Sequence, residues 1–439
     1  MNGVRQPMAA AFRRPRGAVN GTGARALRRP GSGVCDDATV RPRSLVGWMV
    51  AVLVPLTTAA CAGGSSPTVS TPPTSGPSSS ASGSPSPSAV PAGTCARRIV
   101  GRMDAHARAG QLLMVGVPAT DPASGASLVR TYQLGGVFLR GRSSASVARV
   151  RAAVDTLQAA ARAATGLRLE VAADQEGGQV QTLKGPGFGT IPSALVQGTW
   201  STSRLRSTTT TWARALVSAG LTLDLAPVAD TVAPGDADDN PPIGRYDRQY
   251  GGDPALVAQS VTTVVGAMSD AGLGATVKHF PGLGRVHANT DTSTGAVDDV
   301  ATADDPNLQP FAAGIAAGTT AVMVSSASYP RLDPGRLAVF SPAIVTGLLR
   351  QQMGWTGIVM TDDLGSAVAV RSVPVSQRVV AFLAAGGDVV LTVDASDAKP
   401  MTAAIVARAA TDSTFAALVD AAVYRVVLTK VRTGLASCS

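Results

Sequence analysis

The chain has 439 residues, of which 45% are hydrophobic, and a formal net charge of +9 at pH 7. Residues 1–44 hold nine arginines and two aspartates, a net charge of +7, which leaves only +2 for the rest of the chain. A charge this small gives the remaining chain no basic face, so we expect no nucleic-acid partner.

The arginine-rich start leads into an apolar run, LVGWMVAVLVPL, which is followed by TTAA and Cys61. A run of about a dozen apolar residues is too short for a comfortable membrane span and suits the core of a signal peptide. The small residues before the cysteine resemble a bacterial lipoprotein signal. This implies that residues 1–60 are removed, that Cys61 is lipidated, and that the secreted protein is anchored to the outer face of the cytoplasmic membrane. An ordinary secretory signal and a membrane anchor are the alternatives.

A start near Val40 would give a signal of ordinary length, which makes residues 1–39 a candidate gene-start error.

Residues 61–94 form a second segment, built almost wholly from Ser, Pro, Gly, Thr and Ala. Such a composition cannot bury enough apolar surface to offset its ordering entropy, so we expect a flexible linker. Residues 95–439 are then the folded domain.

Cys95 and Cys438 bracket this domain, and outside the cytoplasm a pair at two neighbouring termini favours a disulfide. Two free thiols are the alternative.

The folded domain alternates between short apolar runs and helical stretches rich in Ala, Arg and Val. The eight runs that we predict as strands are 111–117, 135–140, 167–174, 221–230, 274–280, 320–326, 357–363 and 387–393. They are nearly continuously apolar, as in a sheet buried on both faces. Eight such strands alternating with helices predict a single (β/α)8 barrel of the TIM type. A doubly wound open sheet is the alternative, but no glycine-rich dinucleotide fingerprint follows the first run.

Five of the predicted strands end in polar residues, at Asp174–Gly178, Asp230, Lys278–His279, Ser325–Ser326 and Asp362–Asp363. In a barrel these strand ends converge on one mouth, where active sites are built. The chain shows no metal-ligand spacing, no G-x-S-x-G elbow and no phosphate-binding P-loop, so we expect no metal and no cofactor. Glycoside hydrolysis requires two acid/base-capable groups and side chains that bind hydroxyls, and the predicted mouth has both.

Four motifs then give a specific resemblance: DQEGG at 174–178, KHFPGLG at 278–284, YPRLDP at 329–334 and GIVMTDDLG at 357–365. In this order they resemble the bacterial β-N-acetylglucosaminidases (β-N-acetylhexosaminidases) of glycoside hydrolase family 3, and with the signal and linker the actinobacterial lipoprotein type. The resemblance implies a monomeric retaining exo-glycosidase that removes terminal β-linked N-acetylglucosamine from peptidoglycan-derived fragments. A β-glucosidase or another exo-glycosidase of the family is one alternative. A non-catalytic lipoprotein that binds cell-wall glycan is the other.

The resemblance also implies roles for individual residues. Asp362 matches the first Asp of the family's [ST]-D-D pattern and would be the nucleophile, since a retaining mechanism needs an ionised carboxylate below the anomeric carbon. The implied substrate-binding residues are Asp174, Arg248, Lys278 and His279. The family usually carries arginines after DQEGG, whereas this chain has Gln179 and Gln181. This departure leaves the contacts to the neighbouring sugar open.

The position of the acid/base residue departs from the family pattern. Family members place Asp-Ser-His after KHFPGHG, whereas the corresponding residues here are Asn289-Thr290-Asp291. A glutamate supplied from elsewhere is excluded, because the chain contains only Glu170 and Glu176, both on or just after the third strand.

Two residues in this loop are therefore candidates for the acid/base. Asp291 can serve if burial or the charge of Asp362 raises its pKa towards the working pH. His287 titrates near neutrality and would serve if Asp291 held its ring, which would restore the family's dyad in reversed order. A protein without a competent acid is the third possibility.

Overall fold

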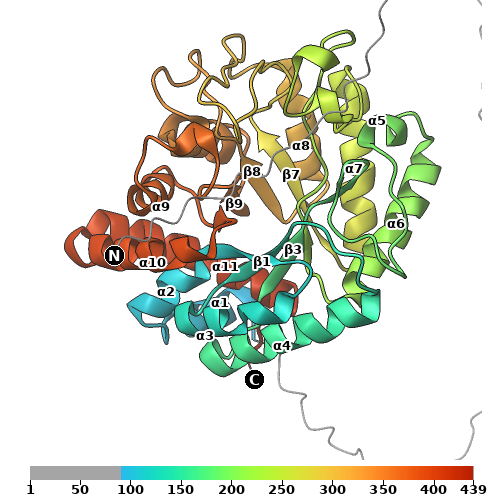
Figure 1. Cartoon of the computed structure of the whole chain (residues 1–439). Coiled ribbons are helices and arrows are strands. Elements are labelled where there is room, and N and C mark those ends of the chain that lie inside the picture. Colours follow the sequence, from blue (N-terminus) through green and yellow to red (C-terminus); the bar gives the residue numbers. More distant parts are fainter. Residues whose placement is uncertain (1–89, 439) are drawn as a thin grey trace, which may run out of the picture. The chain divides into compact units, whose positions relative to one another are not determined.

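A parallel sheet of eight strands lies at the centre of the structure, a computed structural model that describes residues 90–438 (Figure 1). The strands are β1 (Leu113–Pro118), β2 (Gly136–Arg140), β3 (Glu170–Ala173), β6 (Leu223–Asp224), β7 (Gly274–Phe280), β8 (Ala321–Val324), β9 (Ile358–Thr361) and β10 (Val390–Thr392). They are hydrogen-bonded in the order β10-β1-β2-β3-β6-β7-β8-β9. A parallel bridge between Met360 and Val389 joins β9 to the segment leading into β10, so the sheet closes. The predicted (β/α)8 barrel is confirmed, and the open sheet is excluded.

Burial on both faces explains why the strands are apolar throughout. Within β1, Val115 lies opposite Val137 of β2 and Thr392 of β10, and all three are fully buried. Burying a valine side chain stabilises the fold by roughly 1.5–3 kcal/mol, so an alternating polar pattern would be costly here. The continuous apolar runs of the sequence therefore follow from a barrel filled inside and covered outside.

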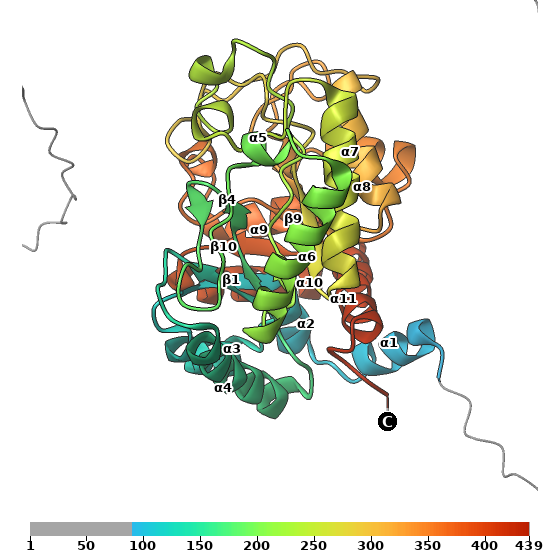
Figure 2. The ribbon, with the colours of Figure 1, turned by 90° about the vertical axis from the view of Figure 1, so that its right-hand side faces the viewer.

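Helices cover the outside of the barrel (Figures 1 and 2). They are α2 (Ala105–Gln111), α3 (Ala126–Tyr132), α4 (Val147–Thr165), α5 (Ala194–Gln197), α6 (Thr202–Ser218), α7 (Pro254–Asp270), α8 (Gln309–Ala316), the π-helix η6 (Ala343–Gln352), α9 (Val375–Ala384), α10 (Ala398–Thr411) and α11 (Ser413–Arg432). Several begin at a capping side chain: Ser146 accepts from the Arg149 N–H, and Ser201 from the Arg204 N–H. Such caps satisfy the N–H groups that the first helical turn leaves unpaired.

The domain begins slightly earlier than the sequence predicts. Helix α1 (Ala92–Val100) starts inside the segment 61–94 that we expected to be linker, because the Pro91 carbonyl accepts the first helical hydrogen bond, from the Cys95 N–H. Pro, Gly and Thr at 91–94 resemble linker composition but are compatible with the first turn of a helix. The signal peptide, Cys61 and most of the predicted linker lie outside the described residues. Within residues 90–438, no helix combines the length and hydropathy needed to cross a bilayer.

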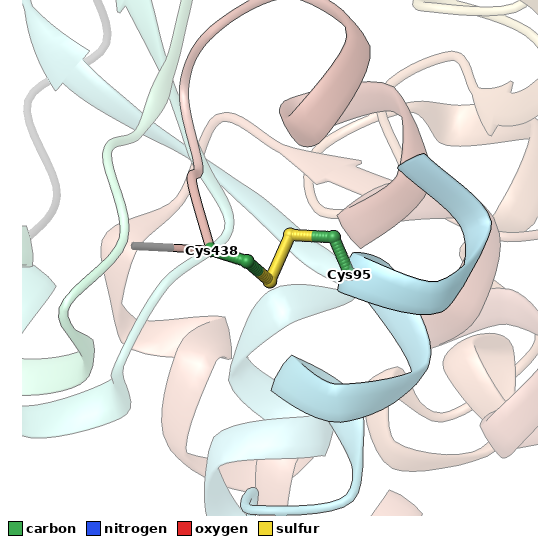
Figure 3. Close-up of a disulfide and its surroundings, with 2 residues drawn as sticks. All are labelled: Cys95 and Cys438. Carbon is green, nitrogen blue, oxygen red and sulfur yellow. A yellow bond between two sulfur atoms is a disulfide. The ribbon is translucent and has the colours of Figure 1, made fainter. Parts of the chain in front are cut away.

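A disulfide joins the two ends of the domain. Cys95 on α1 is bonded to Cys438 with an S–S distance of 2.09 Å (Figure 3). Helix α1 lies against α11 near the end of the chain, which brings the two cysteines together (Figure 2). This is the pairing that the positions of the cysteines in the sequence favour.

Long loops leave the carboxyl ends of the strands and build one face of the barrel. After β3 comes a short hairpin of β4 (Gln175–Gly177) and β5 (Val180–Gln181). The connection from β6 to α7 contains the 3-10 turns η2 (Ala237–Asp239) and η3 (Gly244–Tyr246). Lys278 and His279 lie near the carboxyl end of β7, and the loops after β7 and β9 carry the remaining candidate residues. The motifs found in the sequence therefore meet at one mouth.

Candidate active site

Two basic side chains share one buried carboxylate at the floor of this mouth. The Lys278 Nζ lies 2.7 Å from the Glu176 Oε1 and 2.6 Å from the Asp174 Oδ1. The Arg248 guanidinium makes a bidentate contact with Glu176, at 2.7 Å to Oε1 and 2.8 Å to Oε2. Because bidentate contacts fix both distance and plane, Glu176 holds the two cations in one defined arrangement.

The charges in this cluster stabilise one another. Burial opposes ionisation of Glu176, but Arg248 and Lys278 outweigh it and lower the pKa of Glu176 to about 2. Burial likewise opposes the charged form of Lys278, yet Asp174 and Glu176 raise its pKa above the usual range. At neutral pH both cations are therefore charged and able to donate hydrogen bonds to a ligand.

Asp224, on β6, lies below this cluster, and its carboxyl group is uncharged at neutral pH. Burial raises its pKa to about 8, although Lys278 and a hydrogen bond from the Gln175 N–H act in the opposite direction. A neutral Asp224 leaves Asp174 and Glu176 as the carboxylates that balance Lys278 and Arg248. Sequence reasoning did not find Asp224, because its role depends on depth in the barrel and not on any motif.

His279 is oriented by a buried aspartate. Its Nδ1 lies 2.7 Å from the Oδ2 of Asp230, which is completely buried. The Oδ1 of Asp230 accepts the N–H of Leu283 at 2.7 Å. On the other side of the ring, the Arg248 Nη2 lies 3.4 Å from the His279 Nε2. Since Arg248 can only donate, the His279 Nε2 accepts from it. The His279 Nδ1 therefore carries the ring proton and donates a hydrogen bond to Asp230.

Above these buried contacts lies a cavity of about 500 Å³, a size typical of small-ligand sites. The sequence-predicted residues that line it are Asp174, Arg248, Lys278, His279, Asp291 and Asp362. Each comes from the carboxyl end of a strand or from the loop that follows it, as in other barrels of this type. The structure thus brings together six of the seven residues predicted to contact or react with substrate.

The two adjacent aspartates after β9 differ in their surroundings. Asp363 accepts hydrogen bonds from the N–H groups of Gly365, Ser366 and Val393, which occupies both of its oxygens. Asp362 accepts one hydrogen bond, from the Asp363 N–H to its Oδ1 at 2.8 Å. Among the described residues no donor bonds the Asp362 Oδ2, so that oxygen is available to a ligand. Asp363 holds the turn, and Asp362 faces the cavity.

Asp291 lines the same cavity from the loop after β7. The Asn289 Oδ1 accepts the Asp291 N–H at 2.8 Å, and the Thr290 carbonyl accepts the Ala369 N–H at 3.0 Å. The loop is thereby joined to the segment after β9 that also carries Asp362. Although part of Asp291 remains exposed to solvent, desolvation within the cavity, together with the charge of Asp362, raises its pKa to about 6.

His287 lies outside the cavity, and the dyad that we considered in the sequence is not formed. Its side chain is exposed, and its Nδ1 lies 3.0 Å from the carbonyl oxygen of Asp239. The residues lining the cavity include Asp291 but not His287. The expectation that Asp291 holds the ring of His287 is therefore wrong for this structure, because the loop turns His287 towards η2.

The sequence placed Glu176 and Asp230 at the predicted mouth but assigned neither of them a role. Their roles depend on partners at least 49 residues away in the chain, Lys278, Arg248 and His279. The signal available in the sequence was that both are acidic and follow predicted strands. Among residues 90–438, no group of three or more His, Cys, Asp or Glu side chains is arranged to hold a metal ion.

Comparisons with known proteins agree with this geometry. Residues 105–429 match the glycosyl hydrolase family 3 N terminal domain. A beta-N-acetylhexosaminidase from Beutenbergia cavernae has a similar structure, with a TM-score of 0.72 and 47% sequence identity, covering 74% of this chain and 97% of that one. M tuberculosis LpqI gives a TM-score of 0.66 at 27% identity over 77% of this chain and 96% of its own. A beta-hexosaminidase from Xanthomonas campestris pv. campestris is 35% identical over 292 residues, which are 64% of this chain and 83% of that protein. The match confirms the family predicted from the motifs: the chain belongs to glycosyl hydrolase family 3 and is a glycoside hydrolase acting on O-glycosyl bonds.

Proposed function

We propose that the protein is a retaining exo-β-N-acetylglucosaminidase that uses Asp362 as nucleophile and Asp291 as acid/base. One observation carries this proposal: two carboxyl groups in different electrostatic surroundings line the same cavity. Asp362 keeps one oxygen free of hydrogen bonds from the described residues, while the pKa of Asp291 is raised to about 6. Pairs of titratable groups whose surroundings separate their pKa values are typical of acid and base partners.

The first step forms a glycosyl-enzyme. The Asp362 carboxylate attacks the anomeric carbon, a C–O bond to Asp362 forms, and the bond to the leaving oxygen breaks. The protonated carboxyl of Asp291 gives its proton to that oxygen, so that the leaving group departs as a neutral alcohol. A group with a pKa of about 6 is still partly protonated in a near-neutral medium, which an ordinary aspartate is not.

The second step reverses the role of Asp291. Its carboxylate accepts a proton from a water molecule, the water oxygen attacks the anomeric carbon, and the bond to Asp362 breaks. The sugar is released with its original anomeric configuration, and both aspartates return to their starting protonation states.

The sugar that reacts is bound by the charged cluster on the cavity floor. Lys278 and Arg248 are cations held in fixed positions by Glu176, so they donate to ring hydroxyls without losing further side-chain freedom. Asp174 accepts from a hydroxyl beside Lys278. The relatives named beta-hexosaminidase and beta-N-acetylhexosaminidase support N-acetylglucosamine as that sugar.

The proposal includes a cellular place for the enzyme. A lipid on Cys61 anchors it to the outer face of the cytoplasmic membrane, and the Ser/Pro-rich linker that follows separates the anchor from the barrel. The small residues before Cys61 and the composition of residues 61–94 support this arrangement. Fragments of peptidoglycan are the substrate source at that location, and the enzyme acts on them as a monomer.

Comparing two aryl substrates tests the proposed sugar. We expect 4-nitrophenyl β-N-acetylglucosaminide to be hydrolysed with a higher kcat/KM than 4-nitrophenyl β-glucoside, and Asp362→Asn to lose both activities. A preference for the glucoside would support the β-glucosidase alternative. Binding of N-acetylglucosaminides without turnover, unchanged in Asp362→Ala, would support the non-catalytic glycan-binding alternative.

A further inference from the structure

A basic patch lies at the end of the barrel away from the mouth. We define it by five arginines: Arg97, Arg98, Arg102, Arg168 and Arg432. The first three and Arg432 are exposed, and Arg168 is half-buried. None of the five forms an ion pair with any residue between positions 90 and 438. The small net charge of the domain therefore conceals a local excess of positive charge.

Helix α1 and the turn after it hold three of these arginines in place. Cys95 on the inner side of α1 is buried, and the helix packs against α11. Arg97 and Arg98 are exposed on the same helix, and Arg102 follows four residues after Arg98. The Arg97 guanidinium lies 5.7 Å from the centre of the Tyr424 ring on α11. These charges are thus part of the folded domain, which the disulfide fixes at this point.

The other two arginines line a second cavity, of about 600 Å³, beside the end of the chain. The Arg168 backbone N–H donates to the Leu435 carbonyl at 3.0 Å, which joins the start of β3 to the segment after Arg432. The Arg168 Nε is buried without a hydrogen-bond partner among the described residues. Arg151 also lines this cavity, but Asp155 neutralises it. Two cations and an unused N–H donor therefore remain for an anion such as a phosphodiester.

The patch and the catalytic aspartates lie at opposite ends of the strands. Arg168 precedes β3 by two residues, whereas Asp362 and Asp291 follow the carboxyl ends of β9 and β7. Helix α1 lies at the same corner of the molecule as the end of the chain (Figure 2). Because all eight strands of the barrel are parallel, a surface in contact with the patch leaves the mouth open.

The proposed lipid anchor enters the domain next to this patch. Residues 62–91 contain no charged residue, and the first charges after Cys61 are those of Arg97 and Arg98. Thirty residues span at most about 100 Å even when fully extended, so a lipid on Cys61 keeps the patch near the membrane. Tethering of this kind gives a weak contact a high effective concentration. Basic segments next to a membrane are attracted to anionic lipid headgroups.

We propose that the basic patch docks on anionic phospholipid headgroups and holds the mouth facing away from the membrane. The headgroup phosphodiesters supply the negative charge that the five arginines lack within the domain. The inference rests on the lipid anchor of the proposed function, and it concerns how the anchored enzyme is oriented. The chemistry of bond cleavage is unaffected, since no arginine of the patch lines the cavity that contains Asp362.

Vesicle binding tests the docking without the lipid anchor. The protein is the secreted chain, residues 61–439, with Cys61→Ser, which contains the whole described core and both cysteines of the disulfide. We expect it to sediment with vesicles of phosphatidylglycerol and phosphatidylcholine but not with phosphatidylcholine alone. High salt should release it, because exposed charges are screened. Hydrogen exchange should slow in α1 on the anionic vesicles and stay unchanged in the loops of the mouth.

A triple variant removes the charges of α1 and its following turn: Arg97→Gln, Arg98→Gln and Arg102→Gln. Each basic residue close to an anionic surface strengthens partitioning roughly five-fold. We therefore expect partitioning onto the anionic vesicles to fall by about 100-fold. The thermal midpoint should stay close to that of the parent chain, which shows that the variant is folded.

The matched control removes the same charge at the other end of the barrel, with Arg149→Gln, Arg331→Gln and Arg371→Gln. These arginines are exposed, form no ion pair with the described residues, and follow the carboxyl ends of β2, β8 and β9. Partitioning should stay within about 2-fold of the parent chain, because charges more than a Debye length from the membrane contribute little.

Equal losses in the two triple variants would show that binding follows net charge, and would overturn the inference. So would equal binding to neutral vesicles, or slowed exchange in the loops of the mouth. Binding to soluble polyphosphate without binding to anionic vesicles would assign the patch to a free polymer and would also overturn it. Failure of the proposed anchor gives a different result: mass spectrometry would find Cys61 unmodified in the exported protein, while the Cys61→Ser chain would still bind anionic vesicles.

Discussion

Asp291 and Asp362 are chemically identical side chains to which the proposed mechanism assigns opposite tasks. Desolvation and the neighbouring charge of Asp362 raise the pKa of Asp291 to about 6. Asp362 accepts the Asp363 N–H at its Oδ1, and no donor among the described residues bonds its Oδ2. A carboxyl group that can supply a proton and a carboxylate that can attack the anomeric carbon are the two partners that a retaining mechanism needs.

Replacing Asp291 with Asn removes the proton donor while preserving size. We expect kcat/KM to fall about 10²- to 10⁴-fold for substrates with a poorly acidic leaving alcohol, and less for a dinitrophenyl glycoside, which needs no proton. Added azide should restore turnover of the activated substrate, because azide attacks the glycosyl-enzyme without a base. His287→Ala is the control and should stay within about 2-fold of wild type, since contacts outside the cavity contribute little. A large loss in His287→Ala, with Asp291→Asn unaffected, would exchange the two assignments.

The pH profile gives a second test of the same residue. The acid must be protonated for the first step, and the protonated fraction of Asp291 falls as the pH rises through about 6. We therefore expect kcat/KM of wild type to decline above about pH 6, and Asp291→Asn to lose this decline while keeping its residual rate. A profile whose alkaline limb survives in Asp291→Asn would assign that limb to another group.

The sequence narrowed the acid/base to two residues and could not choose between them. An imidazole is a common acid/base group, and only the path of the loop, fixed by contacts with Asp239 and with the segment after β9, keeps His287 out of the cavity. The position of Asp362 in the cavity could be predicted because the residue belongs to a local motif at a strand end. The contact that Asp230 makes with His279 could not be predicted, because the two residues lie 49 positions apart in the chain.

At the scale of elements, two active-site loops are joined through one buried side chain. The Asn240 Nδ2 donates to the Leu283 and Val286 carbonyls at 2.7 and 2.9 Å. The Asn240 Oδ1 accepts the N–H groups of Ile243 and Gly244. The Asn240 amide thus links the β6–α7 segment, which carries Arg248, to the loop after β7, which carries Asp291.

Asn240→Ala is expected to loosen both loops. The substitution leaves several buried backbone groups without hydrogen-bond partners. Each such group that water cannot reach lowers the free energy of unfolding by about 1–3 kcal/mol. We expect a lower thermal midpoint together with a reduced kcat/KM, because Arg248 and Asp291 lose their fixed positions. Asn307→Ala is the control, since the Asn307 side chain makes no hydrogen bond to the described residues, and it should change neither quantity. Unchanged activity in Asn240→Ala would contradict the proposed coupling of the loops.

Element types were easier to predict than element lengths. All eight apolar runs contain a strand, but β6 comprises only Leu223–Asp224 of a run that we predicted over 221–230. Beyond Asp224 the segment keeps single backbone hydrogen bonds to its neighbours, including a parallel bridge between Val228 and Lys278, without forming a regular ladder. Its apolar residues are therefore buried although the regular strand has ended. The hairpin β4–β5 was missed because two or three residues around Gly177 and Gly178 carry no recognisable period.

At the scale of the molecule, the disulfide joins the amino-terminal and carboxyl-terminal ends of the domain. It connects residues 343 positions apart in the sequence, and the end of the chain returns to the start of the barrel, where the Leu435 carbonyl accepts the Arg168 N–H. This region lies at the amino ends of the strands, away from Asp362 and Asp291. The bond is thus placed to stabilise the fold without touching the cavity.

Replacing both Cys95 and Cys438 with Ser should lower stability and spare activity. A cross-link over such a long loop is typically worth about 2–5 kcal/mol, so we expect a lower thermal midpoint and an unchanged kcat/KM at 25 °C. Wild type treated with a reductant should converge on the midpoint of the double variant. A midpoint equal to that of oxidised wild type would contradict a stabilising role for the bond.

The overall barrel could be predicted because a repeated pattern of buried strands has few topologies available. The charge arrangement inside the mouth could not, since Glu176, Arg248 and Lys278 meet only after three separate strand ends have converged. The family resemblance supplied most of these residues, and the structure supplied the partners that position them.

Covalent trapping of the glycosyl-enzyme tests the central claim most directly. A 5-fluoro-N-acetylglucosaminyl fluoride slows both steps by destabilising the oxocarbenium-like transition state, while its fluoride leaving group keeps the first step the faster one. We predict that intact mass spectrometry finds one sugar added per chain and that peptide fragmentation locates it on Asp362. Asp362→Asn should remain unlabelled. A label on Asp363 or Asp291, or turnover through the substrate's own acetamido group without any protein adduct, would contradict the account.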